Sequence, residues 1–367
     1  MPVLNPRRVL LTADAVGGVW RYALELAEGF AGRGIETVLA VLGPTPNEVQ
    51  REEARAVARL IESDLPLDWT AESEHALARA AGELSLLASR AGAALVQLHA
   101  PAFAGLTRWP VPVVSVAHSC LGTWWDAVRG TDPPDDFAWR VAATAHGLRA
   151  SDAVIAPSNA FAAALRAIYG DDIAITVVHN GRRALPETRA SRERAVLAVG
   201  RLWDEGKNVA ALDRVAGRLH APVYAAGPTA GPNGVASRFE NLRLLGELDQ
   251  ATLQARYAET AVFASPALYE PFGLGVLEAA QSGMALVLSD IPTFRELWDG
   301  AALFVAARAD DEWLRTLTRL LADPAMIARY GALARERARN YTVEAMIDQT
   351  AAVHRAVLPP RRLASVA

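Results

Sequence analysis

Two glutamates that lie eight positions apart around a glycine-rich turn could bind a ligand rich in hydroxyl groups. Glu270 precedes Gly273 and Gly275, and Glu278 follows them inside an apolar stretch that predicts a helix. The glycines let the backbone approach a ligand closely, and the free N–H groups at the start of such a helix favour an anion such as phosphate. Carboxylates beside a phosphate suit a sugar or ribose, whose hydroxyl groups donate hydrogen bonds. The glycine pair alone is equally typical of an ordinary tight turn.

A second candidate site is the loop 200–208, which contains the only lysine of the chain. Of the 37 basic residues, 36 are arginine and one is Lys207. Arg201 and Lys207 bracket this loop between a predicted strand and a predicted helix, and two cations beside free N–H groups suit a diphosphate. The loop has five residues between its glycines where a Walker A loop needs four, and Asn208 stands where that loop needs Ser or Thr. These differences argue against an NTPase.

The N-terminal half contains another glycine pair and three histidines with a possible role at a sheet edge. Gly17 and Gly18 lie between a predicted strand and a predicted helix, so their loop can approach an anion. His99, His118 and His179 each follow a predicted strand, at the edge where open α/β sheets bind ligands. We expect structural roles for His99 and His179 and a functional role for His118. No local spacing supports a metal site built from the three histidines.

Aromatic side chains gather around residues 132–135, at Trp124, Trp125, Phe137 and Trp139. Core packing or a lid explains such a cluster, and an acceptor-binding surface is the alternative. The cluster therefore assigns no function by itself.

The composition is that of a globular protein with large cores. The chain has 367 residues, of which 51% are hydrophobic and 21% are charged, which is enough for two domains. The formal net charge of −4 gives no support for a nucleic acid partner. Cys120 is the only cysteine, which excludes an internal disulfide and a cysteine-based zinc site.

The sequence gives no sign of a membrane span. No apolar run approaches the length of about 18 residues that a span needs, and the N-terminal apolar run reads as a first strand rather than a signal peptide. We expect a cytoplasmic monomer or homodimer, and a peripheral contact at the inner face of the membrane stays open.

Strands and helices alternate in two successive halves, which predicts two doubly wound parallel sheets. The first half has predicted strands at 7–12, 35–41, 94–98, 111–116, 153–155 and 175–178, with helices at 19–31, 48–61 and 71–91. A charged linker at 182–194 separates it from strands at 196–199, 223–226, 242–245, 261–264, 285–288 and 303–305. Helices at 311–321, 325–339 and 343–357 end the chain, and the last one can cross back to the first half.

The order of these sequence features resembles that of the retaining GT-B glycosyltransferases of family 4 along most of the chain, most strongly over 196–305. The matching features are Gly17 and Gly18, His118, the stretch 151–158, Asn180 and Gly181, the loop 200–207, Gly227 and Pro228, Leu245 and Gly246, and the segment 270–278. One departure is Arg183, at a position where the family usually has an acidic residue. This departure affects the linker and leaves the proposed catalytic set intact.

The resemblance implies a GT-B fold in which two Rossmann-like domains face each other across a cleft. Its expected parts are an acceptor domain at 1–184, a nucleotide-sugar donor domain at 193–342, and a C-terminal helix and tail at 343–367 that return to the first domain. The implied reaction moves a hexosyl unit from a UDP- or GDP-sugar to a glycan, lipid or small-molecule acceptor, with retention of configuration and no cofactor. No Asp-x-Asp motif is present, so no metal is expected.

The resemblance also implies the site residues. The expected catalytic set is His118, Arg201, Lys207 and Glu270; the expected donor-binding set is Gly17, Gly18, Gly246, Phe272, Gly273, Leu274, Gly275 and Glu278. Within these sets, Arg201 and Lys207 would hold the diphosphate, and Glu278 would bind the ribose.

Two alternatives stay open at this point. One is a catalytically silent sugar-nucleotide-binding protein, because the presence of site residues does not demonstrate turnover. The other is an NAD-dependent oxidoreductase, which is disfavoured because Glu278 occupies the position of the third glycine of a dinucleotide-binding turn.

Overall fold

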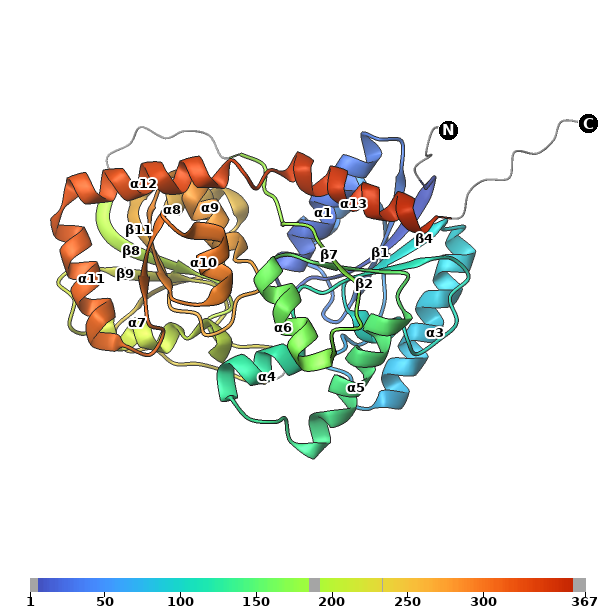
Figure 1. The fold of residues 1–367 in the computed structure, drawn as a ribbon. Helices are drawn as coiled ribbons and strands as arrows, with labels where there is room; N and C mark the ends of the chain where they lie inside the picture. The colour runs from blue at the N-terminus through green and yellow to red at the C-terminus, as the bar shows by residue number, and fades with distance from the viewer. Residues whose placement is uncertain (1–5, 185–191, 233, 359–367) are drawn as a thin grey trace, which may run out of the picture.

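The computed structural model of the chain describes residues 6–184, 192–232 and 234–358. These residues form two parallel sheets that lie side by side, each covered by helices on both faces (Figure 1). The first sheet has the strand order β3-β2-β1-β4-β5-β6-β7, and the second has the order β10-β9-β8-β11-β12-β13. The predicted fold class of two doubly wound α/β domains is therefore confirmed.

The N-terminal domain consists of the elements around the first sheet. Its strands are β1 (Arg8–Asp14), β2 (Glu36–Leu42), β3 (Arg59–Glu62), β4 (Leu95–Leu98), β5 (Val113–Val116), β6 (Ala153–Ala156) and β7 (Ile175–Val177). Its helices are α1 (Gly18–Ala31), α2 (Glu48–Val57), α3 (Glu74–Ala91), α4 (Leu121–Arg129), α5 (Asp135–Ala150) and α6 (Asn159–Tyr169). The central strands read as apolar runs because helices cover both faces of the sheet.

One predicted element is wrong in this domain. The helix expected over 48–61 ends at Val57, and residues 59–62 form the edge strand β3 beside β2. Leu60 and Ile61 pair with Leu39 and Ala40, so the hydrogen bonds of the sheet replace those of the helix.

The C-terminal domain repeats the same architecture. Its strands are β8 (Glu193–Val199), β9 (Val223–Ala226), β10 (Arg243–Gly246), β11 (Thr260–Ser265), β12 (Ala285–Ser289) and β13 (Ala302–Val305). Its helices are α7 (Val209–Ala216), α8 (Gln250–Glu259), α9 (Leu274–Ser282), α10 (Pro292–Trp298), α11 (Asp310–Ala322) and α12 (Pro324–Ala338), with a 3₁₀ turn η2 (Glu205–Lys207). Trp298 of α10 and Trp313 of α11 are fully buried.

The last helix, α13 (Val343–Val357), leaves the C-terminal domain and packs on the N-terminal one (Figure 1). Met346 and Ile347 join the same core cluster as Leu26 and Phe30 of α1. The predicted linker at 182–194 lies partly outside the described residues, and the tail at 359–367 lies wholly outside them. No helix in the described part of the chain has the length and apolar character needed to cross a membrane.

The packing of α13 on α1 predicts an unusual effect of an alanine substitution. A Cβ atom at Gly29 would lie 2.2 Å from Cδ1 of Ile347. Alanine normally stabilises a helix interior by about 1 kcal/mol relative to glycine. We expect Gly29→Ala instead to lower the free energy of unfolding by about 1–3 kcal/mol, the usual effect of overpacking.

Urea unfolding of single and double variants checks this expectation. In an Ile347→Ala background, which removes the obstructing atoms, Gly29→Ala should no longer destabilise the protein. A stabilising Gly29→Ala substitution in the otherwise unchanged chain would show that α13 does not hold this position in solution.

Candidate active site between the two domains

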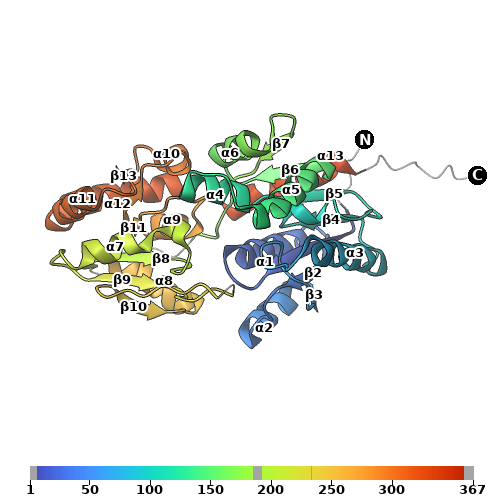
Figure 2. The same cartoon turned by 90° about the horizontal axis from the view of Figure 1, so that it is seen from below.

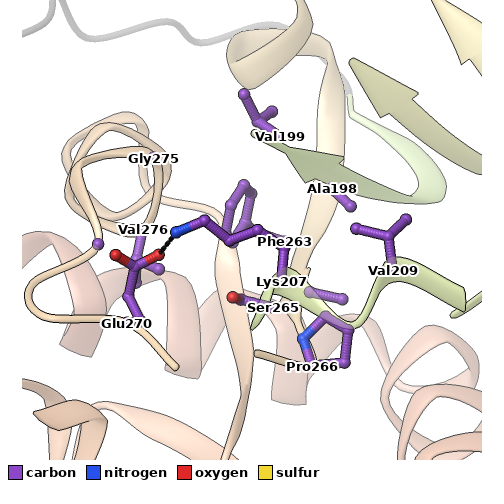
Figure 3. A pocket seen from close by; sticks show the side chains of 12 residues that line it. Ala198, Val199, Lys207, Val209, Phe263, Ser265, Pro266, Glu270, Gly275 and Val276 are labelled. Atoms are coloured by element: carbon purple, nitrogen blue, oxygen red, sulfur yellow. Dashed lines mark hydrogen bonds and ion pairs between the residues drawn. The ribbon is translucent and has the colours of Figure 1, made fainter. Parts of the chain in front are cut away.

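The side chains of Lys207 and Glu270 meet in a small cavity in the C-terminal domain. The Lys207 Nζ atom lies 2.5 Å from Oε2 of Glu270, and the two side chains are only 19% and 15% exposed. Gly273 and Gly275 line the same cavity. Figure 3 shows Lys207 reaching across to Glu270, with Gly275 and Val276 of α9 beside them. The structure thus brings four predicted site residues together.

Backbone contacts fix the two loops that carry this pair. The carbonyl of Gly206 accepts hydrogen bonds from the backbone N–H groups of Leu268 and Tyr269, at 2.9 and 3.1 Å. Asn208 adopts a left-handed conformation with φ of 52°, and its Nδ2 donates to the carbonyls of Pro266 and Ala307. The loop of Lys207 is therefore attached to the loop of Glu270 on both sides of the lysine.

A buried carboxylate, Asp204, organises the cations of this loop. Its Oδ2 accepts from Arg201 Nη2 at 2.9 Å, and its Oδ1 accepts from the Gly206 N–H at 2.9 Å and from Trp124 Nε1 at 3.0 Å. Burial acts to raise the pKa of Asp204, but the positive charges of Arg201 and Lys207 and these hydrogen bonds outweigh it and hold the pKa below its ordinary value. Trp124 belongs to α4, so Asp204 also joins the two domains.

Arg201 faces the N-terminal domain across the boundary between the domains. Its guanidinium lies 5.5 Å from the centre of the Trp203 ring, and its positive charge acts on Asp14 at the end of β1. Burial raises the pKa of Asp14, although a hydrogen bond from the Val16 N–H at 2.9 Å and the charge of Arg201 oppose that rise. Arg201 can therefore interact with groups from both domains.

Two helices begin where the domains come close. Gly273, with φ of 94°, precedes α9, and Gly17 precedes α1; no side chain of the described residues caps either helix. A Cβ atom at Gly18 would lie 3.0 Å from Cδ1 of Leu274, whereas one at Gly17 would meet open space. In Figure 2, α1 lies on the side of its domain that faces the C-terminal domain. The free N–H groups of both helices can therefore attract an anion.

Glu278 lies in α9 but lines a different cavity, of about 460 Å³. Its Oε1 is 3.0 Å from Nε of Arg182, and its Oε2 accepts from the Tyr257 hydroxyl at 3.1 Å. Arg182 Nη1 also lies 3.2 Å from Oε2 of Glu25 in α1. Sequence reasoning missed Arg182 and noted its neighbour Arg183, which forms an exposed ion pair with Glu28.

Three further predicted residues do not line the cavity of the Lys207–Glu270 pair. The His118 ring packs against those of His99 and Tyr22, with centroids 5.1 and 4.6 Å apart, and burial lowers its pKa to about 3. The Phe272 side chain is 2% exposed and lies in the core of the C-terminal domain. Gly246, with φ of 69°, ends β10 at the edge of the sheet.

The described residues include no group of three or more His, Cys, Asp and Glu side chains arranged to hold a metal ion. Arg201, Lys207, Asp204 and Glu270 instead form a compact group of two cations and two carboxylates. Such an arrangement can bind a phosphate through its cations and hydroxyl groups through its carboxylates.

Two families of known proteins match successive parts of the chain. Residues 16–183 match the family described as Glycosyltransferase Family 4, and residues 193–323 match the family described as Glycosyl transferases group 1. A similar curated protein is the glycogen synthase of Mycobacterium tuberculosis strain H37Rv, which is 27% identical over 88% of this chain and 86% of its own length.

Solved structures agree in fold. Sucrose-phosphate synthase from Thermosynechococcus elongatus superposes with a TM-score of 0.78 at 18% identity, covering 95% of this chain and 98% of that one. Anabaena Alr3699/HepE in complex with UDP and glucose superposes with a TM-score of 0.74 at 15% identity, covering 95% and 99%. At this identity, the superpositions establish the two-domain fold alone.

The position of Asp204 predicts a large effect of removing its charge. An asparagine can keep the bonds from Trp124 and Gly206 through its amide oxygen, but it turns an NH₂ group towards Arg201. We expect Asp204→Asn to lower the free energy of unfolding at pH 7 by about 1–3 kcal/mol. Because folding lowers the pKa of Asp204, the difference from the unmodified protein should shrink as the pH falls below the ordinary value of 3.8.

Asp310→Asn provides the matched control, measured by urea unfolding at several pH values. Asp310 pairs with Arg214 on the surface, where the two side chains are 28% and 56% exposed. Such a pair contributes about 0–1 kcal/mol. Equal losses in the two variants, or a loss that persists at low pH, would contradict the role given to Asp204.

Proposed function

We propose that the chain, whose two halves match glycosyltransferase families in succession, transfers a hexosyl unit from a UDP- or GDP-sugar to an acceptor, with retention of configuration and without a metal. The observation that carries this proposal is the Lys207–Glu270 pair beside the uncapped start of α9. The cation and the helix N–H groups suit a phosphate, and the carboxylate suits the hydroxyl groups of the sugar attached to it.

The proposed chemistry rests on charge stabilisation. Breaking the bond between sugar and phosphate increases the negative charge of the leaving diphosphate. Cations that are already in position stabilise this charge more strongly than they stabilise the intact donor. Asp204 holds Arg201 in position, and the contacts of Gly206 and Asn208 hold the loop of Lys207, so little reorganisation is needed when the charge develops.

Glu270 and Lys207 can exchange partners when a donor binds. Sugar hydroxyl groups can replace Lys207 as hydrogen-bond donors to Glu270, and a phosphate oxygen can replace Glu270 beside the ammonium group. Glu278 would bind the ribose, at the edge of the 460 Å³ cavity, and Gly246 would lie near the base. His118 would contact the sugar as a neutral imidazole, because burial lowers its pKa to about 3.

In this proposal, residues 1–184 form the acceptor domain, residues 193–342 form the donor domain, and residues 343–367 return to the acceptor domain. Gly17 and Gly18 would line the cleft between donor and acceptor. Relatives in fold include sucrose-phosphate synthase and a protein crystallised with UDP and glucose, which supports a nucleotide-sugar donor. The acceptor is a glycan, a lipid or a small molecule.

Nucleotide release from a panel of UDP-, GDP- and ADP-sugars tests the function and identifies the donor. Release that depends on one sugar nucleotide, increases with candidate acceptors and persists in EDTA is the expected result. The anomeric configuration of the product, read by NMR, tests retention. Tight binding of a sugar nucleotide without any release would instead indicate a catalytically silent binding protein.

Lys207 should be the cation whose loss reduces turnover most strongly. We expect Lys207→Ala to lower kcat by about 10² to 10³, the scale found when one group that stabilises transition-state charge is removed. Arg214→Ala, which removes a surface cation from the same domain, is the control and should leave kcat unchanged. Near-normal turnover of a folded Lys207→Ala variant would remove this residue from the mechanism.

A further inference from the structure

Tyr269 immediately precedes Glu270 in the sequence, but its side chain lies in the other domain. The residue is 9% exposed and belongs to a core cluster whose other buried members come from the N-terminal domain, including Cys120 of α4 and Phe161 of α6. The Phe161 and Tyr269 rings meet edge to face, with centroids 6.3 Å apart. A loop of the donor domain therefore depends on the acceptor domain for the burial of its largest side chain.

The hydroxyl group of Tyr269 takes part in a chain of hydrogen bonds at the start of α4. It accepts from the backbone N–H of Cys120 at 3.3 Å and lies 2.9 Å from Oγ1 of Thr123. The Thr123 hydroxyl donates to the Cys120 carbonyl at 3.2 Å, so the Tyr269 proton can be donated to Thr123. Burial raises the pKa of Tyr269, which keeps this proton on the phenol.

The residue on the other side of Glu270 is also bound by the N-terminal domain. The hydroxyl of Ser158, which is fully buried, donates to the carbonyl of Pro271 at 2.8 Å. Both neighbours of Glu270 are thus attached to the N-terminal domain, while the Glu270 carboxylate pairs with Lys207 of the C-terminal domain. The position of this carboxylate depends on both domains at once.

We propose that the Tyr269 hydroxyl is a positioning group that completes the alignment of Glu270 with Lys207 when the two domains are in contact, in addition to the backbone bonds to Gly206. The proposal rests on the role of Glu270 at the transferred sugar. Tyr269 does not touch the substrate itself. It links the approach of the domains to the completion of the donor site, so separation of the domains would also release the carboxylate from its aligned position.

Tyr269→Phe tests the proposal by removing only the hydroxyl group. We expect kcat for nucleotide release to fall about five- to tenfold, the factor that corresponds to the loss of the shorter of its two buried hydrogen bonds, the one with Thr123. KM for the donor should change less than twofold, because Arg201 and the helix N–H groups remain in place. Thr123→Val should lower kcat similarly, and the double variant should be no worse than the poorer single variant, because both remove the same bond.

Tyr341→Phe is the matched control. Its hydroxyl is likewise buried and donates to the carbonyl of Leu297 at 3.2 Å, within the C-terminal domain. Its removal should lower the free energy of unfolding as Tyr269→Phe does, but it should leave kcat within twofold of the unmodified protein. If Tyr341→Phe lowers kcat as much as Tyr269→Phe does, the effect comes from general stability and the proposal is wrong.

The single cysteine provides a second measurement that needs no turnover. Cys120 is buried in the cluster that Tyr269 enters, so its reaction with Ellman's reagent reports how often the domains separate. We expect Tyr269→Phe to raise the reaction rate about five- to tenfold, the factor for losing the shorter of its two hydrogen bonds, and Tyr341→Phe to leave it unchanged. Unchanged thiol reactivity in Tyr269→Phe would overturn the proposal.

The two measurements separate this proposal from the proposed function. If the unmodified protein releases no nucleotide from any sugar donor, the transferase function fails. Thiol protection would then still show whether Tyr269 holds the domains together. If nucleotide is released and Tyr269→Phe matches the unmodified protein in kcat, the function stands and the positioning role is overturned.

Discussion

The candidate site depends on two positive charges, those of Arg201 and Lys207, that are held close together near the boundary between the domains. Arg201 and Lys207 lie in one short loop of the C-terminal domain; Arg201 pairs with Asp204 of the same loop, and Lys207 pairs with Glu270 of the loop before α9. Asp204 is the central group, because it also fixes the Gly206 N–H and the Trp124 indole. A buried carboxylate with these partners positions the cations, closes the loop and attaches it to α4 of the other domain.

Much of the fold could be predicted from the sequence because buried parallel strands have a strong signature. Helices cover both faces of such strands, so the strands appear as apolar runs that end at glycine or polar residues. The strand β3 was missed because Leu60 and Ile61 continue the helical pattern of the preceding segment, and only the pairing with β2 decides their conformation. No function of the aromatic residues around Trp124 could be predicted from the sequence, because the hydrogen-bond partner of Trp124 is Asp204, 80 positions away.

The candidate site could be predicted where its residues form a local motif or stand out by their type. Glu270, Gly273 and Gly275 form one motif, and Lys207 stands out as the only lysine, so the group that the structure brings together was foreseen. Arg182 and Tyr269 were not foreseen, because each acts through contacts between distant segments. An arginine in a charged linker and a tyrosine beside a glutamate are ordinary in a sequence. Only the structure shows that Arg182 pairs with Glu25 and Glu278 and that Tyr269 contacts Thr123.

The charge balance explains why the starts of two helices belong at this boundary. The positive charges of Arg201 and Lys207 are already balanced by Asp204 and Glu270, so a diphosphate would add negative charge to a nearly neutral site. Each uncapped helix start contributes about half of a positive charge, and α1 and α9 supply one from each domain. Glu270 lowers the remaining repulsion if it turns from Lys207 to the hydroxyl groups of the sugar. A ligand with both phosphate and sugar would therefore fit this site better than phosphate alone.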